Sequence, residues 1–179
     1  FHYGRFLYRR FRRLYPALLA TLVLTLAAGW FLFFPYRFLE LATETIFSLL
    51  HIVNFYFWQN INYFNLRSGT VPLLHMWSLS IEEQFYVFFP LACWIIWKLA
   101  PRLLLPATIV FLTVSFGLGL YFSPQKPELS FYLLPTRAWE LLIGAVLALV
   151  LHGRQISGAW LHAMGPLGLC LIAAAIVLY

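Results

Sequence analysis

Arginines cluster just before the first long apolar run. They lie in the stretch FLYRRFRRLYP, where Arg10 and Arg13 are spaced i, i+3 and Arg9 and Arg13 are spaced i, i+4. Residues at these spacings share one face of a helix, and a guanidinium can grip a phosphate with two parallel hydrogen bonds. The cluster therefore predicts a site for the phosphates of a nucleotide-like ligand. The alternative is that it anchors the chain to anionic headgroups and sets its topology.

A second polar motif, HMWSLSIEEQFY, opens another apolar run and holds His75, Glu82 and Glu83. A carboxylate at membrane depth costs about 2.5–3.5 kcal/mol on the insertion scale, so such residues are candidates for function. His75 is suited to general acid or base catalysis near neutral pH, with a carboxylate to orient it. The alternative for the glutamates is a capping box with Ser78 or Ser80, and a lone histidine is more often structural.

The third motif, FYLLPTRAWELLIGA, places Arg137 and Glu140 one helical turn apart within an apolar run. Pairing with each other would lower their insertion cost. Alternatively, Arg137 faces a polar cavity and meets a substrate or the glutamate pair of the second motif. Trp77 and Trp139 lie beside these charges and are suited either to an interfacial belt or to stacking on a sugar.

Composition requires that lipid surrounds the elements that carry these motifs. The chain is 63% hydrophobic and only 10% charged, whereas a soluble domain has about 25% charged residues. The net charge of +6 comes from basic residues that flank apolar runs, which the positive-inside rule explains without nucleic acid. Cys93 and Cys170 have no metal-ligand spacing, and no metal site is predicted.

Apolar runs of about 20 residues predict membrane spans. These are Pro16–Pro35, Leu79–Trp97, Leu103–Phe122, Ser130–Leu151 and Ala159–Tyr179. Phe38–Trp58 is shorter in its uncharged part and contains His51 and Asn54, so we predict a re-entrant or tilted segment there. If it does not cross, Lys98 and Arg102 fall on the same side as the arginine cluster. The predicted fold is all-α, a polytopic transmembrane helix bundle with about five to six membrane segments.

Together and in this order, the three motifs resemble the acyltransferase 3 family of bacterial membrane proteins. The family has an RxxR pattern followed by proline, matched by Arg10, Arg13 and Pro16. Its H-x-W-S-L-[SA]-x-E-E-Q-F-Y block is matched from His75 to Tyr86, and its L-P-T-R-x-W-E-L-L-x-G-A block from Leu134 to Ala145. The resemblance covers essentially the whole chain. It predicts one transmembrane acyltransferase domain over residues 1–179, truncated at both ends.

The resemblance implies a multi-pass O-acyltransferase of the bacterial inner membrane. The implied donor substrate is acyl-CoA, usually acetyl-CoA from the cytoplasm, with no bound cofactor. The implied acceptor is a hydroxyl of a cell-envelope glycan, such as peptidoglycan or the O-antigen of lipopolysaccharide. The branch with this third block often carries an SGNH hydrolase-like domain after its last helix.

The resemblance also implies roles for individual residues. In the family the arginine pair is tied to the donor, which assigns Arg10 and Arg13 to donor binding, with Arg9 beside them. The catalytic candidates are His75, Glu82, Glu83 and Arg137: the glutamates would orient a histidine or the acceptor, and Arg137 would balance their charge. The essential histidine of the family precedes the arginine motif, and this chain begins after that position. The fragment alone is therefore expected to be inactive, and none of its own histidines is assigned that role.

A transporter or flippase of a lipid-linked or small polar substrate is the alternative function, because intramembrane Arg–Glu pairs are also expected there. Helices interrupted by glycine or proline at corresponding positions of two halves would favour it, and no such pattern is found. A purely structural membrane subunit is the third alternative, and the adjacent glutamates argue against it.

Overall fold

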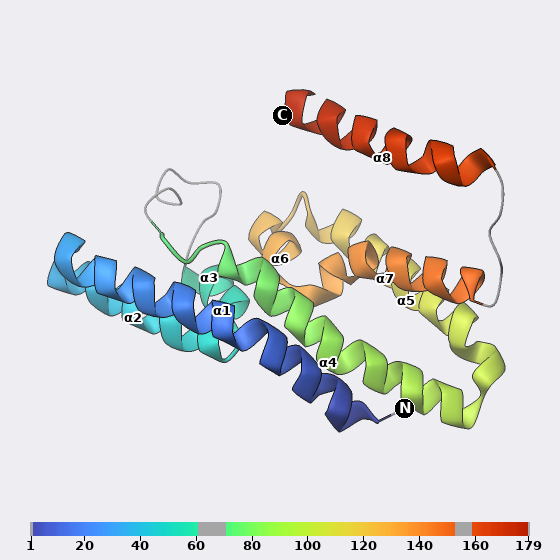
Figure 1. Cartoon of the computed structure of the whole chain (residues 1–179), viewed down its shortest axis with the longest axis horizontal. Helices are drawn as coiled ribbons and strands as arrows, with labels where there is room; N and C mark the ends of the chain where they lie inside the picture. Colours follow the sequence, from blue (N-terminus) through green and yellow to red (C-terminus); the bar gives the residue numbers. More distant parts are fainter. Residues whose placement is uncertain (1, 61–70, 153–158, 179) are drawn as a thin grey trace.

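Helices make up nearly all of the described chain. The computed structural model describes residues 2–60, 71–152 and 159–178, and those residues contain no strand (Figure 1). The helices are α1 (Tyr3–Leu32), α2 (Pro35–Leu49), α3 (Val53–Asn60), α4 (Met76–Leu99), the 3-10 turn η2 (Pro101–Leu103), α5 (Leu104–Phe122), α6 (Pro127–Tyr132), α7 (Leu134–Leu151) and α8 (Ala159–Leu178). The all-α fold prediction is confirmed.

Four described stretches are long and apolar enough to cross a membrane, which makes the chain a multi-pass membrane protein. They are Tyr3–Leu32, Met76–Leu99, Pro101–Phe122 and Pro127–Leu151. The last three contain the spans predicted for them. The first overlaps the predicted span Pro16–Pro35 but ends at Leu32, and it begins earlier than predicted because the arginine motif is itself helical. The fifth predicted span corresponds to α8, whose described apolar part is Met164–Ile176; Tyr179 lies outside the described residues.

Residues 38–58 form two helices, because the chain breaks after α2. His51 has a φ of 54°; its N–H donates to the Ser48 carbonyl at 3.1 Å, and the Ile52 N–H donates to the Phe47 carbonyl at 3.0 Å. These are the two hydrogen bonds of a Schellman C-cap, in which glycine usually occupies the left-handed position. The segment is therefore not one continuous helix, and its re-entrant path through the membrane stays a prediction.

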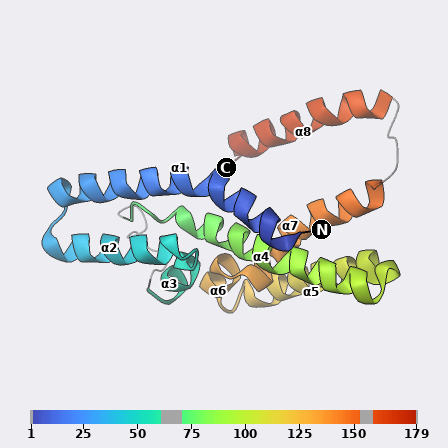
Figure 2. The same cartoon turned by 60° about the horizontal axis from the view of Figure 1, so that its bottom comes forward.

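Figures 1 and 2 show α2 returning alongside α1. Gly29 of α1 permits this close approach, since a Cβ atom there would collide with the Leu41 side chain of α2. Figure 2 also shows α1 bending along its length, and Pro16 lies inside it. A proline inside a helix removes a backbone hydrogen bond and kinks the axis.

The basic ends of the bundle lie together. In Figure 1 the start of α1 and the end of α4 meet at one end of the molecule, and α7 also ends on that side. Lys98 is in the last turn of α4 and Arg102 is in η2, which follows α4 directly. The basic residues therefore lie at one end of the bundle: the arginine motif, Lys98 and Arg102. This is the arrangement expected if the α2–α3 segment enters the membrane and returns to the same side.

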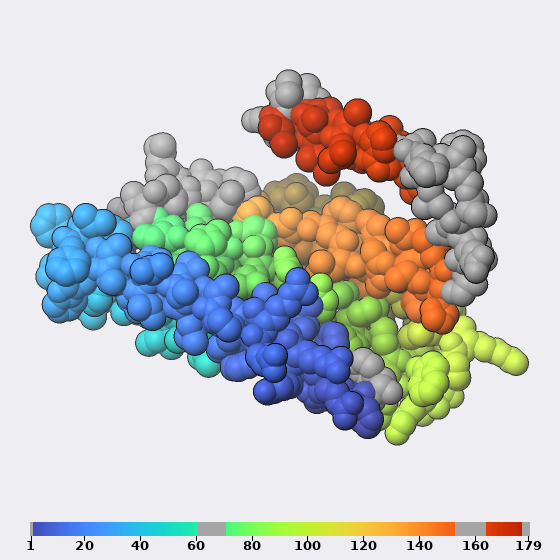
Figure 3. All heavy atoms as spheres, in the orientation of Figure 1, coloured from blue at the N-terminus to red at the C-terminus, as the bar shows by residue number. Residues whose placement is uncertain are grey.

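The buried core lies where α1, α2, α3, α4 and α6 meet. Its fully or nearly buried side chains are Leu18, Leu22, Leu41, Val53, Phe57, Leu73, Met76 and Tyr132. α8 stands apart from this core: Figure 3 shows it separated from the rest of the bundle, and the described part of the chain gives it no close helix partner. The core therefore fixes the α1–α7 region, which carries all three motifs.

Candidate functional site

A charge pair joins the arginine motif on α1 to the glutamate motif on α4. Arg10 Nη2 donates to Glu83 Oε1 at 2.8 Å, and the guanidinium carbon lies 3.2 Å from the centre of the Tyr86 ring. The two side chains are only 26% and 15% exposed. Water screens a half-buried ion pair less than a surface pair. Two motifs that are 73 residues apart in the chain thus form one site.

The structure divides the arginines that the sequence grouped on one helix face. Arg10 turns toward α4, whereas Arg9 and Arg13 are exposed on α1. Neither Arg9 nor Arg13 forms an ion pair with any described residue. The buried Nε of Arg10 also has no hydrogen-bond partner in this region. The three guanidiniums therefore differ in their surroundings, because Arg10 is paired with Glu83, and their predicted role in donor binding stays a prediction.

A cavity of about 450 Å³ lies between α1, α4 and the break that follows α2. Its wall is mostly apolar, with Tyr8 and Phe11 contributed by α1. Its polar groups come from Glu83, Gln84 and His51. An apolar cavity with a few polar groups is typical of a small-molecule site.

His51 contributes an imidazole to this cavity from a backbone position that most residues avoid. Its Nδ1 atom is buried and makes no hydrogen bond to the described chain, and its ring meets the Tyr15 ring edge to face at 5.6 Å. Burial lowers the pKa of His51, and the nearby Glu83 carboxylate partly opposes this. The neutral imidazole is therefore favoured and can accept a proton. The only sign of this placement in the sequence is a polar residue inside an apolar run.

Buried amides connect this cavity to the next helices. Gln84 Nε2 donates to the His51 carbonyl at 2.9 Å and to Asn54 Oδ1 at 2.8 Å. Asn54, which has no exposed surface, donates in turn to the Tyr132 carbonyl at 3.1 Å. A satisfied buried network of this kind fixes the relative position of its elements. Sequence reasoning did not find Gln84 or Asn54 as parts of the site.

The capping-box alternative for the glutamates is wrong. α4 begins at Met76, so Glu82 and Glu83 lie beyond its first turn. Ser78 and Ser80 instead donate their hydroxyls to the backbone carbonyls of His75 and Met76, both at 3.1 Å. The serines are satisfied inside the helix, and the glutamates are left for tertiary contacts.

The remaining candidates of the second motif do not join the charge pair. Glu82 is exposed, because adjacent helical residues point about 100° apart. His75 is also exposed, at the start of α4, and its side chain has no hydrogen bond or ion pair in the described ranges. The expected orientation of His75 by a carboxylate is therefore not found.

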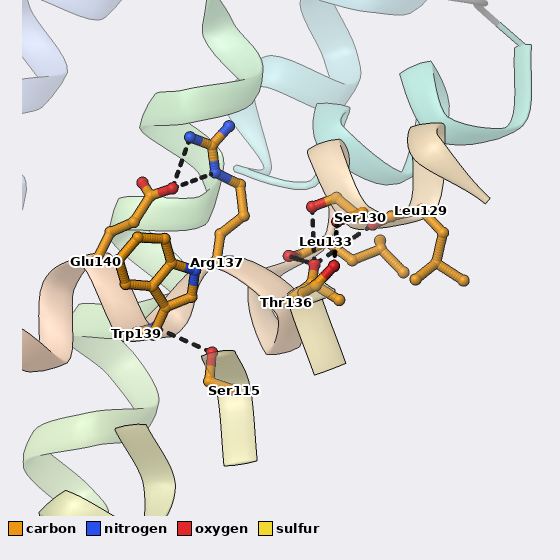
Figure 4. Close-up of polar contacts among 9 residues, drawn as sticks. Ser115, Leu129, Ser130, Leu133, Thr136, Arg137, Trp139 and Glu140 are labelled. Carbon is orange, nitrogen blue, oxygen red and sulfur yellow. Dashed lines mark hydrogen bonds and ion pairs between the residues drawn. The ribbon is translucent and has the colours of Figure 1, made fainter. Parts of the chain in front are cut away.

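Arg137 pairs within its own helix (Figure 4). Its Nε and Nη2 atoms donate to Glu140 Oε1 at 3.0 and 2.8 Å. Its guanidinium carbon lies 4.9 Å from the centre of the Trp77 ring of α4 and 5.2 Å from that of Phe131. The predicted contact between Arg137 and Glu82 or Glu83 is wrong. The α4 residue that Arg137 contacts is Trp77. Glu83 lies further along α4, where it contacts Arg10 of α1.

A second cavity, of about 310 Å³, lies beside this pair and between α5, α6 and α7. The predicted span 130–151 breaks at Leu133, which is extended and separates α6 from α7. Thr136 closes the break, since its hydroxyl lies 2.8 Å from the Leu133 carbonyl and 3.0 Å from the Ser130 carbonyl (Figure 4). α5 approaches closely at Gly119, where a Cβ atom would be 2.9 Å from the Thr136 carbonyl.

Glu44 of α2 is a buried acid that sequence reasoning missed. Its residue is 3% exposed, and its Oε2 atom has no hydrogen-bond partner within the described region. Burial raises the pKa of Glu44 to about 7, partly opposed by Arg37. The residues that the structure describes contain no group of three or more His, Cys, Asp or Glu side chains that could hold a metal. The cost of a carboxylate in an apolar segment, which singled out Glu82 and Glu83, would also have singled out Glu44.

Comparison with known proteins identifies the family. The chain is 35% identical over 165 residues to the peptidoglycan O-acetyltransferase OatA of Listeria monocytogenes, a match that covers 86% of this chain. The chain belongs to the acyltransferase 3 family. It is also 32% identical over 146 residues to the O-acetyltransferase OatA of Staphylococcus aureus, which covers 79% of the chain. The family predicted from the three motifs is confirmed.

This acyltransferase 3 chain spans about a quarter of the length of those relatives, 25% and 24%. No family model matches it, and no solved structure matches it. The family assignment therefore comes from the motifs together with the two relatives.

Proposed function

We propose that the chain is part of a bacterial inner-membrane enzyme that transfers an acyl group, in practice acetyl, from acyl-CoA to a hydroxyl of a cell-envelope glycan. The observation that carries this proposal is the similarity to proteins named as O-acetyltransferases over 86% and 79% of the chain. One of them is named for peptidoglycan, which makes peptidoglycan the first acceptor to test. The transporter alternative has no comparable support.

The arrangement of α1 and α4 supports donor binding at the basic end. Arg9 and Arg13 are exposed and free of ion pairs within the described chain, so their forks are open to the phosphates of the donor. The cavity of about 450 Å³ opens beside the same part of α1 and is suited to the acyl end. Arg10 and Glu83 lie at its edge, where their charges can respond to a bound thioester.

The transfer itself requires a base and a stabilised oxyanion. The acceptor hydroxyl oxygen attacks the acyl carbonyl carbon and forms the new C–O bond, while a base takes the hydroxyl proton. The C–S bond then breaks, and the thiolate of coenzyme A leaves and takes up a proton. Glu83 and His51 are the proton-accepting groups of the described cavity.

The direct test is transfer of labelled acetyl from acetyl-CoA to peptidoglycan by the full-length protein in liposomes. Replacing Arg13 with Lys keeps the charge but removes the fork, so affinity for acetyl-CoA should fall about tenfold. Arg102→Lys is the matched control, because Arg102 lies at the same basic end but in η2. Both variants should insert normally.

Absence of label on the glycan with the unmodified protein would reject the proposed function. Equal acetyl-CoA affinity in the Arg13→Lys and Arg102→Lys proteins would leave the arginine motif only its role in anchoring and topology.

A further inference from the structure

The second cavity lies at the end of the bundle away from the basic residues. α5 begins at Leu104, just after the η2 turn that holds Arg102, and ends at Phe122. The cavity is lined by Gly119 and Ser123, which lie at that far end. If the basic end faces the cytoplasm, this cavity faces the opposite side, where an envelope glycan is found. Trp77 lies beside this second cavity and Glu83 lines the first. The two residues are six positions apart on α4, which is about 9 Å of helix.

The Arg137–Glu140 pair leaves polar atoms open beside this cavity. Both donors of Arg137 end on Oε1 of Glu140, so Glu140 Oε2 and Arg137 Nη1 have no partner in the part of the chain that the structure describes. Figure 4 shows these two atoms turned away from the contact between the side chains. A carboxylate oxygen accepts hydrogen bonds and a guanidinium nitrogen donates them, so a ligand with several hydroxyls can satisfy both.

Aromatic rings line the same cavity. Trp139 and Phe116 meet edge to face with ring centres 5.1 Å apart, and Phe131 completes the wall. A pyranose ring carries an apolar C–H face and a rim of hydroxyls. Aromatic side chains present large apolar surfaces of fixed geometry, and together with the charged pair they match both parts of a sugar.

We propose that this cavity is the acceptor subsite and binds one pyranose ring of the glycan, with Trp139 on the apolar face and Glu140 and Arg137 on the hydroxyls. The inference rests on the proposed function and names the place of its acceptor. The competing explanation is that Arg137 and Glu140 only neutralise each other to lower their cost in the membrane. A purely structural pair would leave the affinity for glycan unchanged.

The experiment measures the KM for soluble peptidoglycan fragments with the full-length protein at saturating acetyl-CoA. Trp139→Leu removes the flat surface, and Glu140→Gln removes one charge without changing shape. Each should raise the KM for the fragments about tenfold, the usual effect of losing one contact to a charged or aromatic group, with acetyl-CoA affinity unchanged. Trp97→Leu is the control, since Trp97 is an exposed tryptophan at the other end of α4. Unchanged KM values in both variants would overturn the subsite.

Equilibrium dialysis of the same fragments without acetyl-CoA separates the subsite from the proposed function. Binding that is lost in Glu140→Gln, without any acetyl transfer by the unmodified protein, would uphold the subsite and reject the function. Normal transfer with equal KM values in Trp139→Leu, Glu140→Gln and Trp97→Leu would uphold the function and reject the subsite. An unmodified protein that neither binds nor acetylates the fragments would overturn both.

Discussion

At the scale of single residues, packing separates two glutamates that the sequence cannot distinguish. Glu83 faces α1 and meets Arg10, while its neighbour Glu82 is exposed. The stacking of Arg10 on Tyr86 adds a second contact that holds the guanidinium at the edge of the larger cavity. The site therefore depends on one carboxylate, and its partner comes from a distant motif.

Replacing Glu83 with Gln should weaken both stability and transfer. The change leaves the half-buried Arg10 without its counter-charge, which we expect to cost about 1–3 kcal/mol of unfolding free energy. Thermal unfolding in detergent and acetyl transfer by the full-length protein would measure this. Glu82→Gln is the matched control and should change stability by less than about 0.5 kcal/mol. Equal effects of the two substitutions would show that the Arg10–Glu83 contact has no special role.

The sequence predicted the charged residues of the site but not their partners. It nominated Arg10, Glu83 and Arg137 because charges within apolar runs are costly. It paired Arg137 with the wrong helix, because the side-chain direction of α4 depends on which helix packs against it. The partner at i+3, Glu140, was the local alternative, and it is the contact found.

At the scale of elements, the break between α2 and α3 places His51 in the larger cavity. A left-handed backbone position disfavours residues with a Cβ atom, and glycine is the usual residue in this kind of helix end. The apolar run of residues 38–58 hinted at the break only through His51 and Asn54. The long uncharged runs, in contrast, predicted their helices well, because about 20 apolar residues in succession have few alternatives to spanning.

Replacing His51 with Gly tests the imidazole without disturbing the helix end. Glycine fits the left-handed position, so stability should stay equal or rise by up to about 1 kcal/mol. Acetyl transfer by the full-length protein should fall, because the cavity loses its buried ring nitrogen. Thermal unfolding and transfer rates would be compared with His51→Ala, which also lacks the ring but keeps the backbone strain. Full activity in the glycine protein would mean that His51 serves only the local fold.

At the scale of the whole molecule, α4 runs from the wall of the larger cavity to the side chains that flank the smaller one. Glu83 and Gln84 line the larger cavity, and Trp77 lies under Arg137 beside the smaller one. The amide bridge through Asn54 ties α4 to α3 and α6, so the α2–α3 segment is held to elements that flank both cavities. An acyl group that moves from the basic end toward the far end would pass along α4.

This arrangement predicts that both ends of the α2–α3 segment face the same side of the membrane. Single cysteines at Arg37 and Gln59, in a protein whose Cys93 and Cys170 are replaced by Ala, should react with an impermeant maleimide from one side only. The reason is that α2 and α3 are separated by a helix end at His51 and that α2 returns alongside α1. A cysteine in place of Lys98 is the control. It should react with the maleimide from the opposite side of the membrane, which is the side predicted for the arginine motif. Labelling of Arg37 and Gln59 positions from opposite faces would show that the segment crosses, and it would place Lys98 and Arg102 against the positive-inside rule.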